Sequence, residues 1–443
     1  MPDDEISFKR STGLASTDRK RKPLTGILLL LVIYCFQGVE SVAQNSDSSV
    51  VDNSKSNYFP PFKNQGKVAS CDWFACVYYQ MTYLKNRQLQ RPYSESTAFS
   101  PKFGFTMVNN GKIFPDNLWF TDVYAFIKKH GSPYLNNFKY DLNEGEHFKE
   151  WCVDSTVWRK AISNRIKDCE AIPFDMKKIK HLLYDGEVLV TQFNPFNANY
   201  LQSKNNPNTS KDDASINEYV ISSGVNGSDH TVCVVGYNDH IWIDRNNNNV
   251  IESDELGAFK IAESYLDEHV NNGFRWLSYG CVTNRETTLL FENKLWRMIL
   301  YERYSPKILV QITLSHEERG NLKFQFGNSE TNTIESAKSS NIIFDPVATG
   351  FTPGASGKSL IAGANYSFDG TIGEHDGSFT FDLTDIDNDY NTRYWFFRLE
   401  NTSNKSGKIK SYKIIDLDNN EIKTYEKLPI DLKTGETVLF IKK

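Results

Sequence analysis

The sequence predicts an α+β protein in which a mixed helix–strand segment over 58–290 is followed by an all-β segment over 300–443. Two observations lead to this prediction. Apolar residues recur at helical spacing over 72–85, and β-branched runs replace them after residue 230. In the later segment, short alternating runs are separated by Gly, Asn and Asp turn residues, which is typical of a β-sandwich or jelly roll.

The individual elements follow from the same periodicities. Helical spacing predicts helices over 72–85, 122–129 and 176–183. Strand patterns in the first segment predict strands over 188–193, 231–237, 241–243 and 258–262. The second segment predicts strands over 308–314, 322–326, 378–383, 394–399, 409–415 and 437–441. Because this segment carries no catalytic constellation, we expect an accessory domain there.

The composition is that of an ordinary globular chain. Of 443 residues, 39% are hydrophobic and 24% are charged, and the length suffices for two domains. The formal net charge of −5 lacks the basic excess of nucleic-acid-binding proteins, so we expect no nucleic-acid partner.

Residues 1–43 have the features of a signal peptide. Basic residues at 20–22 precede an apolar run over 24–36, and small residues at 41–43 form a cleavage site. The run is short for a bilayer span, although an uncleaved anchor is the alternative. We therefore expect export to the periplasm, cell surface or medium, with no stable membrane span after cleavage. A Ser-, Asn- and Asp-rich linker is expected over 44–57.

Six cysteines remain after the predicted cleavage: Cys71, Cys76, Cys152, Cys169, Cys233 and Cys281. Export permits disulfides, and proximity in the sequence favours a bond between Cys152 and Cys169. No CxxC pair is present, which argues against a structural zinc site.

Cys71 opens the first predicted helix. The free N–H groups and partial positive charge of a helix N-terminus favour a thiolate over a thiol. Gln65, six residues earlier, could supply a side-chain N–H that joins the Cys71 backbone N–H in an oxyanion hole. The alternative is that Cys71 is a buried core cysteine.

His230 begins a β-branched strand that runs to Gly236 and Tyr237. A single histidine at the start of a strand is often structural. Cys233 is three residues further on and points to the opposite face of a strand, so the two side chains are not expected to bind a metal together.

These two segments resemble the papain-like cysteine peptidases. The matching residues are Gln65-Gly66, Ser70-Cys71, Trp73-Phe74-Ala75 and His230-Thr231-Val232-Cys233-Val234-Val235-Gly236-Tyr237. The resemblance covers 58–290 and is to an exported, bacterial-type member with an added C-terminal β domain. It implies a helical lobe and a β lobe with a cleft between them, and hydrolysis of a protein or peptide substrate. It also implies that Cys71 is the nucleophile, His230 its base and Gln65 the oxyanion donor.

The third catalytic position departs from the family's Asn-Ser-Trp-Gly pattern. Glu263 takes the place of the asparagine, and Tyr265 takes the place of the shielding tryptophan. A carboxylate can accept the imidazole N–H and hold the histidine charged to higher pH. The loss of the tryptophan is expected to admit more water. The alternative function is that of a catalytically degenerate member that binds peptides or proteins.

The stretch between two predicted strands, 244–255, fits the twelve-residue EF-hand pattern, with Asn249 in place of the glycine at position 6. Asn tolerates positive φ better than most residues. The sequence predicts a structural Ca²⁺ site, for which a polar surface hairpin is the alternative. The expected ligands are Asp244, Asn246, Asn248, the Val250 carbonyl, Glu252 and Glu255.

Overall fold

The computed structural model describes residues 48–115, 120–195, 198–224, 230–265, 271–283, 293–344, 365–386 and 392–443. Residues from Ser48 to Lys443 form one compact unit. The predicted signal peptide over 1–43 lies outside the described residues. Within those residues, no helix is long and apolar enough to cross a membrane.

A continuous helical segment over 71–88 runs through the centre of the fold. It consists of α2 (Cys71–Trp73), the π-helical η2 (Phe74–Met81) and α3 (Thr82–Gln88). Every residue of η2 is buried, including Gln80. The Gln80 amide donates to the carbonyls of Val188 (2.9 Å) and Trp296 (3.1 Å). The helix predicted over 72–85 is therefore confirmed, with ends slightly further out.

Further helices surround this segment. The α-helices are α4 (Pro101–Val108), α5 (Phe120–His130), α6 (Ser155–Ile162), α7 (Met176–Tyr184) and α8 (Tyr279–Thr283). Short 3-10 helices are η1 (Asn53–Lys55), η3 (His147–Lys149), η4 (Asp213–Ser215), η5 (Ser253–Glu255), η6 (Asn271–Gly273), η8 (Arg319–Asn321), η9 (Ile334–Ser336) and η10 (Thr384–Ile386). Of these, α5 and α7 were predicted. Asp154 caps α6 by accepting the Thr156 N–H at 2.7 Å, and the Asp175 side chain caps α7.

A nine-stranded sheet has the order β2-β9-β3-β6-β7-β8-β5-β4, with β1 beside β6. The strands are β1 (Val50–Asp52), β2 (Ile166–Pro173), β3 (Leu189–Phe193), β4 (Asn199–Gln202), β5 (Tyr219–Ser223), β6 (His230–Trp242), β7 (Leu256–Ala262), β8 (Phe274–Ser278) and β9 (Lys294–Leu300). Only β5 and β8 pair in parallel among these strands. The strands predicted over 231–237 and 241–243 belong largely to the single long strand β6.

The sheet extends past both predicted limits of the first segment. β1 lies inside the predicted linker over 44–57 and pairs with β6, from Val50 opposite Asn238 to Asp52 opposite Gly236. A Cβ at Gly236 would lie 2.1 Å from the Val51 carbonyl oxygen, so the glycine makes this close approach possible. At the other end, β9 lies beyond residue 290 and pairs with β2 and β3. A linker was predicted here because residues 44–57 are mostly polar. The three residues of β1 within this stretch nevertheless satisfy their backbone groups in the sheet.

The C-terminal segment forms two sheets, ordered β13-β10-β15-β16 with β17 beside β15, and β12-β11-β14-β18. The strands are β10 (Ile308–His316), β11 (Leu322–Ser329), β12 (Ala337–Phe344), β13 (His375–Asp382), β14 (Tyr394–Asn401), β15 (Gly407–Asp416), β16 (Glu421–Thr424), β17 (Ile430–Asp431) and β18 (Gly435–Lys442). The sheets face one another, because Phe326 contacts Phe381 (ring centroids 5.3 Å apart) and Phe397 contacts Tyr412 (5.6 Å). The six strands predicted in this segment are present.

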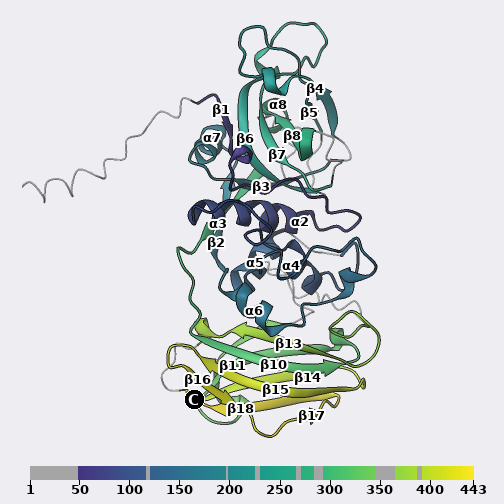
Figure 1. Ribbon diagram of the computed structural model, residues 1–443, viewed down its shortest axis with the longest axis vertical. Coiled ribbons are helices and arrows are strands. Elements are labelled where there is room, and N and C mark those ends of the chain that lie inside the picture. Colours follow the sequence, from purple (N-terminus) through teal and green to yellow (C-terminus); the bar gives the residue numbers. More distant parts are fainter. Residues whose placement is uncertain are drawn as a thin grey trace, which may run out of the picture. The chain divides into compact units, whose positions relative to one another are not determined.

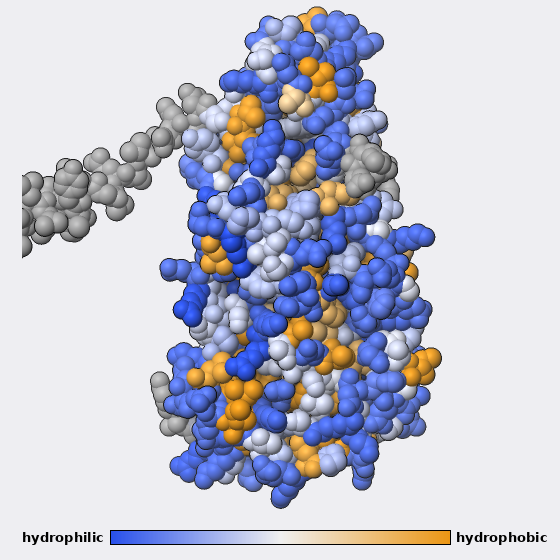
Figure 2. Space-filling model, in the orientation of Figure 1, coloured by the Kyte–Doolittle hydropathy of each residue, from blue (hydrophilic) through white to orange (hydrophobic). Residues whose placement is uncertain are grey.

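Figure 1 shows the helices α3–α6 between the strands of the nine-stranded sheet and the C-terminal sheets. Trp158 of α6 packs on Phe381 of β13, with ring centroids 5.2 Å apart. The helices and the C-terminal sheets therefore share one hydrophobic core. Figure 2 shows that one face of the molecule is mostly hydrophilic, with small separate hydrophobic patches.

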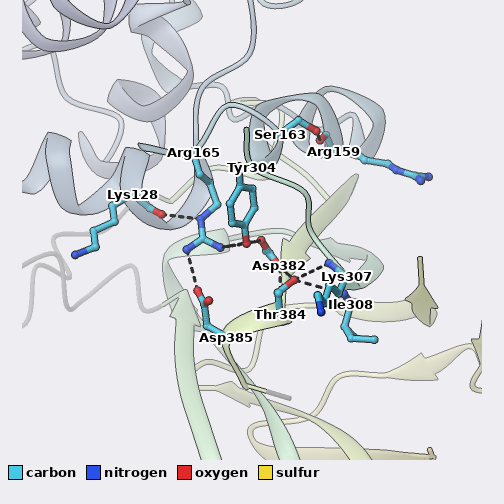
Figure 3. A network of polar contacts seen from close by, with 10 residues as sticks. All are labelled: Lys128, Arg159, Ser163, Arg165, Tyr304, Lys307, Ile308, Asp382, Thr384 and Asp385. Atoms are coloured by element: carbon cyan, nitrogen blue, oxygen red, sulfur yellow. Dashed lines mark hydrogen bonds and ion pairs between the residues drawn. The ribbon is translucent and has the colours of Figure 1, made fainter. Parts of the chain in front are cut away.

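An ionic network centred on the buried Arg165 joins the helices to the C-terminal sheets (Figure 3). Arg165 donates to the Lys128 carbonyl (2.7 Å), to Tyr304 (2.5 Å) and to the carboxylates of Asp382 and Asp385 (2.8 Å each). We call this set of five residues the junction network.

The predicted disulfide between Cys152 and Cys169 is wrong. All six cysteines of the described residues are free. Cys152 is buried just before α6, whereas Cys169 is half-buried on β2. Closeness in the sequence therefore did not predict pairing, because a helix separates the two residues.

Candidate functional site

Cys71 lies at the N-terminus of the central helical segment, where α2 packs against β6. The thiol is half-buried. The preceding residue, Ser70, shares a hydrogen bond of 2.9 Å with the Tyr140 hydroxyl, and that hydroxyl donates to the Gln65 carbonyl at 2.7 Å. The loop before the helix is thereby held against Tyr140, which fixes the position from which Cys71 projects.

Three adjacent strands bring charged side chains together, because the residues that carry them lie at the same end of these strands. His230 is the first residue of β6, Glu263 follows the last residue of β7, and Arg275 lies near the start of β8. Because β6, β7 and β8 are antiparallel neighbours, the start of β6, the end of β7 and the start of β8 lie side by side. The His230 Nε2 atom lies 2.6 Å from Glu263 Oε2, and both side chains are buried.

The imidazole also interacts with Cys71, which adds to the upward shift of its pKa. Burial by itself disfavours the charged imidazole. The charge of Glu263 and the hydrogen bonds to Cys71 and Glu263 outweigh burial and raise the pKa of His230 to about 10. The pKa of Glu263 is lowered, because the charge of His230 overcomes the effect of burial. The pair is therefore an imidazolium–carboxylate ion pair at neutral pH.

Gln65 is buried and held at both ends of its amide. Its Nε2 donates to the Val68 carbonyl at 2.9 Å, and its Oε1 accepts the Ser264 hydroxyl at 2.7 Å. Its backbone N–H also donates to the Ser264 carbonyl at 2.6 Å. An amide nitrogen carries two hydrogens, so one N–H of Gln65 remains for a further acceptor. The structure thus brings Gln65 beside the segment that carries Glu263.

The site is buried although Tyr265 takes the position of the shielding tryptophan. Tyr265 is 62% exposed, whereas the Glu263 side chain is only 2% exposed. The Phe193 ring covers His230, with ring centroids 5.9 Å apart. On the other side, Arg275 Nη1 lies 4.0 Å from Glu263 Oε1. An aromatic ring and a guanidinium from neighbouring strands therefore provide the cover.

A second carboxyl group lies near the imidazole. Asp72 follows Cys71 and accepts hydrogen bonds from the hydroxyl of Thr231 and from Gln192 Nε2 (3.3 Å). Burial raises the pKa of Asp72, and these hydrogen bonds and the charge of His230 oppose the rise. Asp72 thus connects α2 to the paired strands β3 and β6.

The structure brings together four of the predicted calcium ligands in the loop between β6 and β7. The Asp244 carboxylate accepts the N–H groups of Asn248 and Asn249 at 3.0 Å. The amides of Asn246 and Asn248 donate to Glu252 at 2.9 and 3.4 Å. Asn249 has φ +57°, the left-handed conformation that position 6 requires.

The last predicted ligand does not share this arrangement. Glu255 is buried, and its two oxygens accept the Arg245 N–H (2.6 Å) and Trp242 Nε1 (3.2 Å). At the first position, Lys204 Nζ lies 2.5 Å from Asp244 Oδ2. An ammonium group therefore already contacts one of the carboxylates that a cation would need.

Within the part of the chain that the structure describes, Asp141, His147 and Glu150 place ligand atoms within 4.8 Å of one another. The Lys102 ammonium forms ion pairs with both Asp141 and Glu150. Because a buried ammonium already balances these carboxylates, the group is a structural ion cluster.

Sequence reasoning missed Tyr140, Asp72 and Arg275. Only Arg275 had a visible signal, as a lone cation inside the otherwise apolar strand β8. Tyr140 lies in an irregular segment, and its contact with Ser70 joins residues that are 70 positions apart. No local pattern could have predicted that contact.

No protein-family model and no curated protein matches the chain. Similar solved structures include a digestive procathepsin L2 proteinase from Tenebrio molitor larval midgut (15% identity, TM-score 0.38, covering 57% of this chain and 68% of that one). The Amb a 11 cysteine protease of ragweed pollen, in its proform, is similar at 15% identity and TM-score 0.40 over 57% and 67% of the two chains. A structure from work on the mite allergens Blo t 1 and Der p 1 matches at 14% identity and TM-score 0.39 over 59% and 74%. Similarity at this level does not assign an activity.

Proposed function

We propose that this protein is a cysteine peptidase that hydrolyses peptide bonds through an acyl-enzyme at Cys71. The observation that carries the proposal is the buried His230–Glu263 pair at 2.6 Å, with Cys71 close enough to the imidazole to raise its pKa. A nucleophile, a base and an orienting group in this order form the arrangement required for nucleophilic catalysis.

The proposed reaction assigns a role to each of these residues. The Cys71 thiolate attacks the scissile carbonyl, and the protonated His230 gives its proton to the leaving amine. His230 then takes a proton from water, which attacks the thioester and releases the acid and the Cys71 thiolate. The free N–H of Gln65 and the backbone N–H of Cys71 stabilise the oxyanion in both steps. Glu263 keeps the imidazole oriented through Nε2, which leaves Nδ1 for the cysteine.

Labelling with an epoxide cysteine-protease inhibitor tests this proposal, with Cys71→Ala as the control. The chain also contains an internal reference, because Cys169 is half-buried like Cys71. Burial raises the pKa of Cys169, so it should react slowly and as a thiol. We expect a single adduct at Cys71 by peptide mass, absent from Cys71→Ala, and cleavage of peptide substrates by the wild-type chain alone.

The alternative is a degenerate member that uses the cleft to bind peptides. In that case Cys71 would react no faster than Cys169 with iodoacetamide near pH 6, and peptides would bind without being cleaved. That outcome would contradict the peptidase proposal.

We also propose that residues 1–43 direct export and are removed after Ala43, in keeping with the order of basic, apolar and small residues. N-terminal sequencing of the mature protein, after expression of the full chain in an exporting host, tests this. A mature N-terminus at Gln44 is expected, and an intact Met1 in the membrane fraction would contradict cleavage.

For the loop over 244–255 we propose a structural Ca²⁺ site. The left-handed Asn249 and the hydrogen bonds from Asn248 and Asn249 to Asp244 support it. The ion would stiffen the connection between β6, which carries His230, and β7, which leads to Glu263. It would have no part in the chemistry.

Lys204 allows the direction of a change in Ca²⁺ affinity to be predicted. Because its ammonium contacts Asp244, a cation must compete with it. Ca²⁺ should raise the melting temperature of the wild-type protein, since binding to the folded state alone stabilises it. Lys204→Met should bind Ca²⁺ more tightly, and Asp244→Asn more weakly. Equal melting curves with Ca²⁺ and with chelator in all three proteins would show a polar hairpin.

A further inference from the structure

Glu263 places a full negative charge where a neutral residue would serve to orient His230. If Cys71 is a thiolate and His230 an imidazolium, the two charges cancel. An added buried carboxylate leaves a net negative charge next to the thiolate, which disfavours loss of the thiol proton. A second cation nearby would remove this penalty.

The structure contains such a cation in Arg275. Its Nη1 lies 4.0 Å from Glu263 Oε1, the oxygen that His230 does not use. The Arg275 side chain is only 14% exposed. It is held from the far side by Tyr200, whose hydroxyl accepts from Nη1 at 3.0 Å and whose ring lies 4.7 Å from the guanidinium carbon. Arg275 is thus fixed beside Glu263.

We propose that Arg275 is a positioning residue that balances the charge of Glu263, so that Cys71, His230, Glu263 and Arg275 form a line of alternating charges. This inference rests on the proposed peptidase function. The contacts of Arg275 in the described residues include Glu263 and Tyr200. Arg275 acts by making the carboxylate compatible with a thiolate, and Tyr200 keeps it in place.

Other ionisable groups near the line are few among the described residues. From the central helix come Asp72, which Thr231 and Gln192 bind, and Tyr79, whose hydroxyl donates to the Glu263 carbonyl at 2.7 Å. From β4 comes Tyr200. Of these, Asp72 alone adds a carboxyl group, and burial raises its pKa against the hydrogen bonds from Thr231 and Gln192. Arg275 is therefore the described cation that faces Glu263 besides His230.

The charge-balance role predicts that Arg275 matters only while Glu263 is charged. A double-mutant cycle of Arg275→Met and Glu263→Gln in the full chain tests this. The measurement is the rate of Cys71 alkylation by iodoacetamide across pH, mapped by peptide mass with Cys169 as reference, together with kcat and KM. Arg275→Met should move the acid limb of the alkylation profile up by about one pH unit. It should also lower kcat about tenfold with little change in KM.

In the Glu263→Gln background the same substitution should leave the acid limb almost unmoved. Arg275→Lys should preserve the wild-type limb, because it retains the charge, whereas Tyr200→Phe should shift the limb slightly. If Arg275→Met does not fold, Arg275→Gln replaces it in the cycle. Equal shifts in both Glu263 backgrounds, or a shift in Arg275→Lys as large as in Arg275→Met, would overturn the charge-balance role.

Failure of the peptidase proposal has a separate signature. If wild-type Cys71 reacts no faster than Cys169 at any pH, the site is not an activated nucleophile. If wild-type Cys71 is fast but the cycle is additive, only the role of Arg275 is wrong.

Discussion

The protein contains two buried ionic clusters that differ in how completely their atoms are paired. In the junction network every nitrogen of Arg165 donates a hydrogen bond, and both oxygens of Asp382 accept at least one. In the site cluster Glu263 Oε1 and Arg275 Nε are buried without a hydrogen-bond partner among the described residues.

The physical meaning of the two clusters differs accordingly. A fully satisfied buried network rigidifies the elements that it joins. A partly satisfied one is costly to maintain and is typical of sites where charge has to develop or move. We therefore interpret the junction network as structural and the site cluster as functional, and the following predictions test that division.

The largest expected effect is on activity at the site cluster. His230→Asn should lower kcat by about 10²- to 10⁴-fold, because a general acid–base is lost. Asn can still donate to Glu263, so the melting temperature should change little. Peptide hydrolysis and thermal unfolding, measured on the same preparation, check this. Full activity in His230→Asn would contradict the interpretation of the site cluster as functional.

The next largest effect is on stability at the junction network. Arg165→Met leaves Asp382, whose side chain is 1% exposed, without its cation. Loss of one partner of a buried pair should lower the free energy of unfolding by about 3–5 kcal/mol. Denaturant unfolding measures the change. The kcat of the remaining folded molecules should stay near the wild-type value, and a selective loss of kcat would make the junction part of the functional site.

The pH dependence of stability and of kcat/KM tests whether Glu263 keeps His230 charged. His230 has a pKa of about 10 in the folded protein, against an ordinary value of 6.5. Its ion pair therefore stabilises the fold fully below about pH 6.5, and this contribution is lost as the pH rises through about 10. The alkaline limb of kcat/KM should lie near pH 10. In Glu263→Asn it should fall by about 1–3 units, because an opposite charge is removed.

The smallest effect separates the two acidic partners of Arg165. The Asp385 side chain is 64% exposed, so its ion pair is screened by solvent. Asp385→Asn should cost no more than about 1 kcal/mol of unfolding free energy. Asp382→Asn, its matched control, should cost distinctly more. Equal losses in denaturant unfolding would mean that burial does not decide the strength of these pairs.

Local patterns in the sequence predicted the elements that have a clear period. The helix that begins at Cys71, the strand that begins at His230 and the six predicted C-terminal strands all follow from periodic burial. The family resemblance pointed to Gln65, Cys71, His230 and Glu263. The structure places Glu263 beside His230, and Gln65 beside Ser264, the residue after Glu263. The roles of these residues in catalysis stay predictions.

The sequence by itself determined the helices and strands that have a clear period, because a period depends on neighbours a few residues apart. Only the tertiary structure decided which distant groups share the site. Arg275 and Tyr200 meet Glu263 because β4, β5 and β8 are adjacent, and Cys152 and Cys169 stay apart because α6 separates them. The strand β1 can pair with β6 because Gly236 has no Cβ that would collide with the backbone of β1. These outcomes depend on contacts between residues far apart in the chain, which no local period encodes.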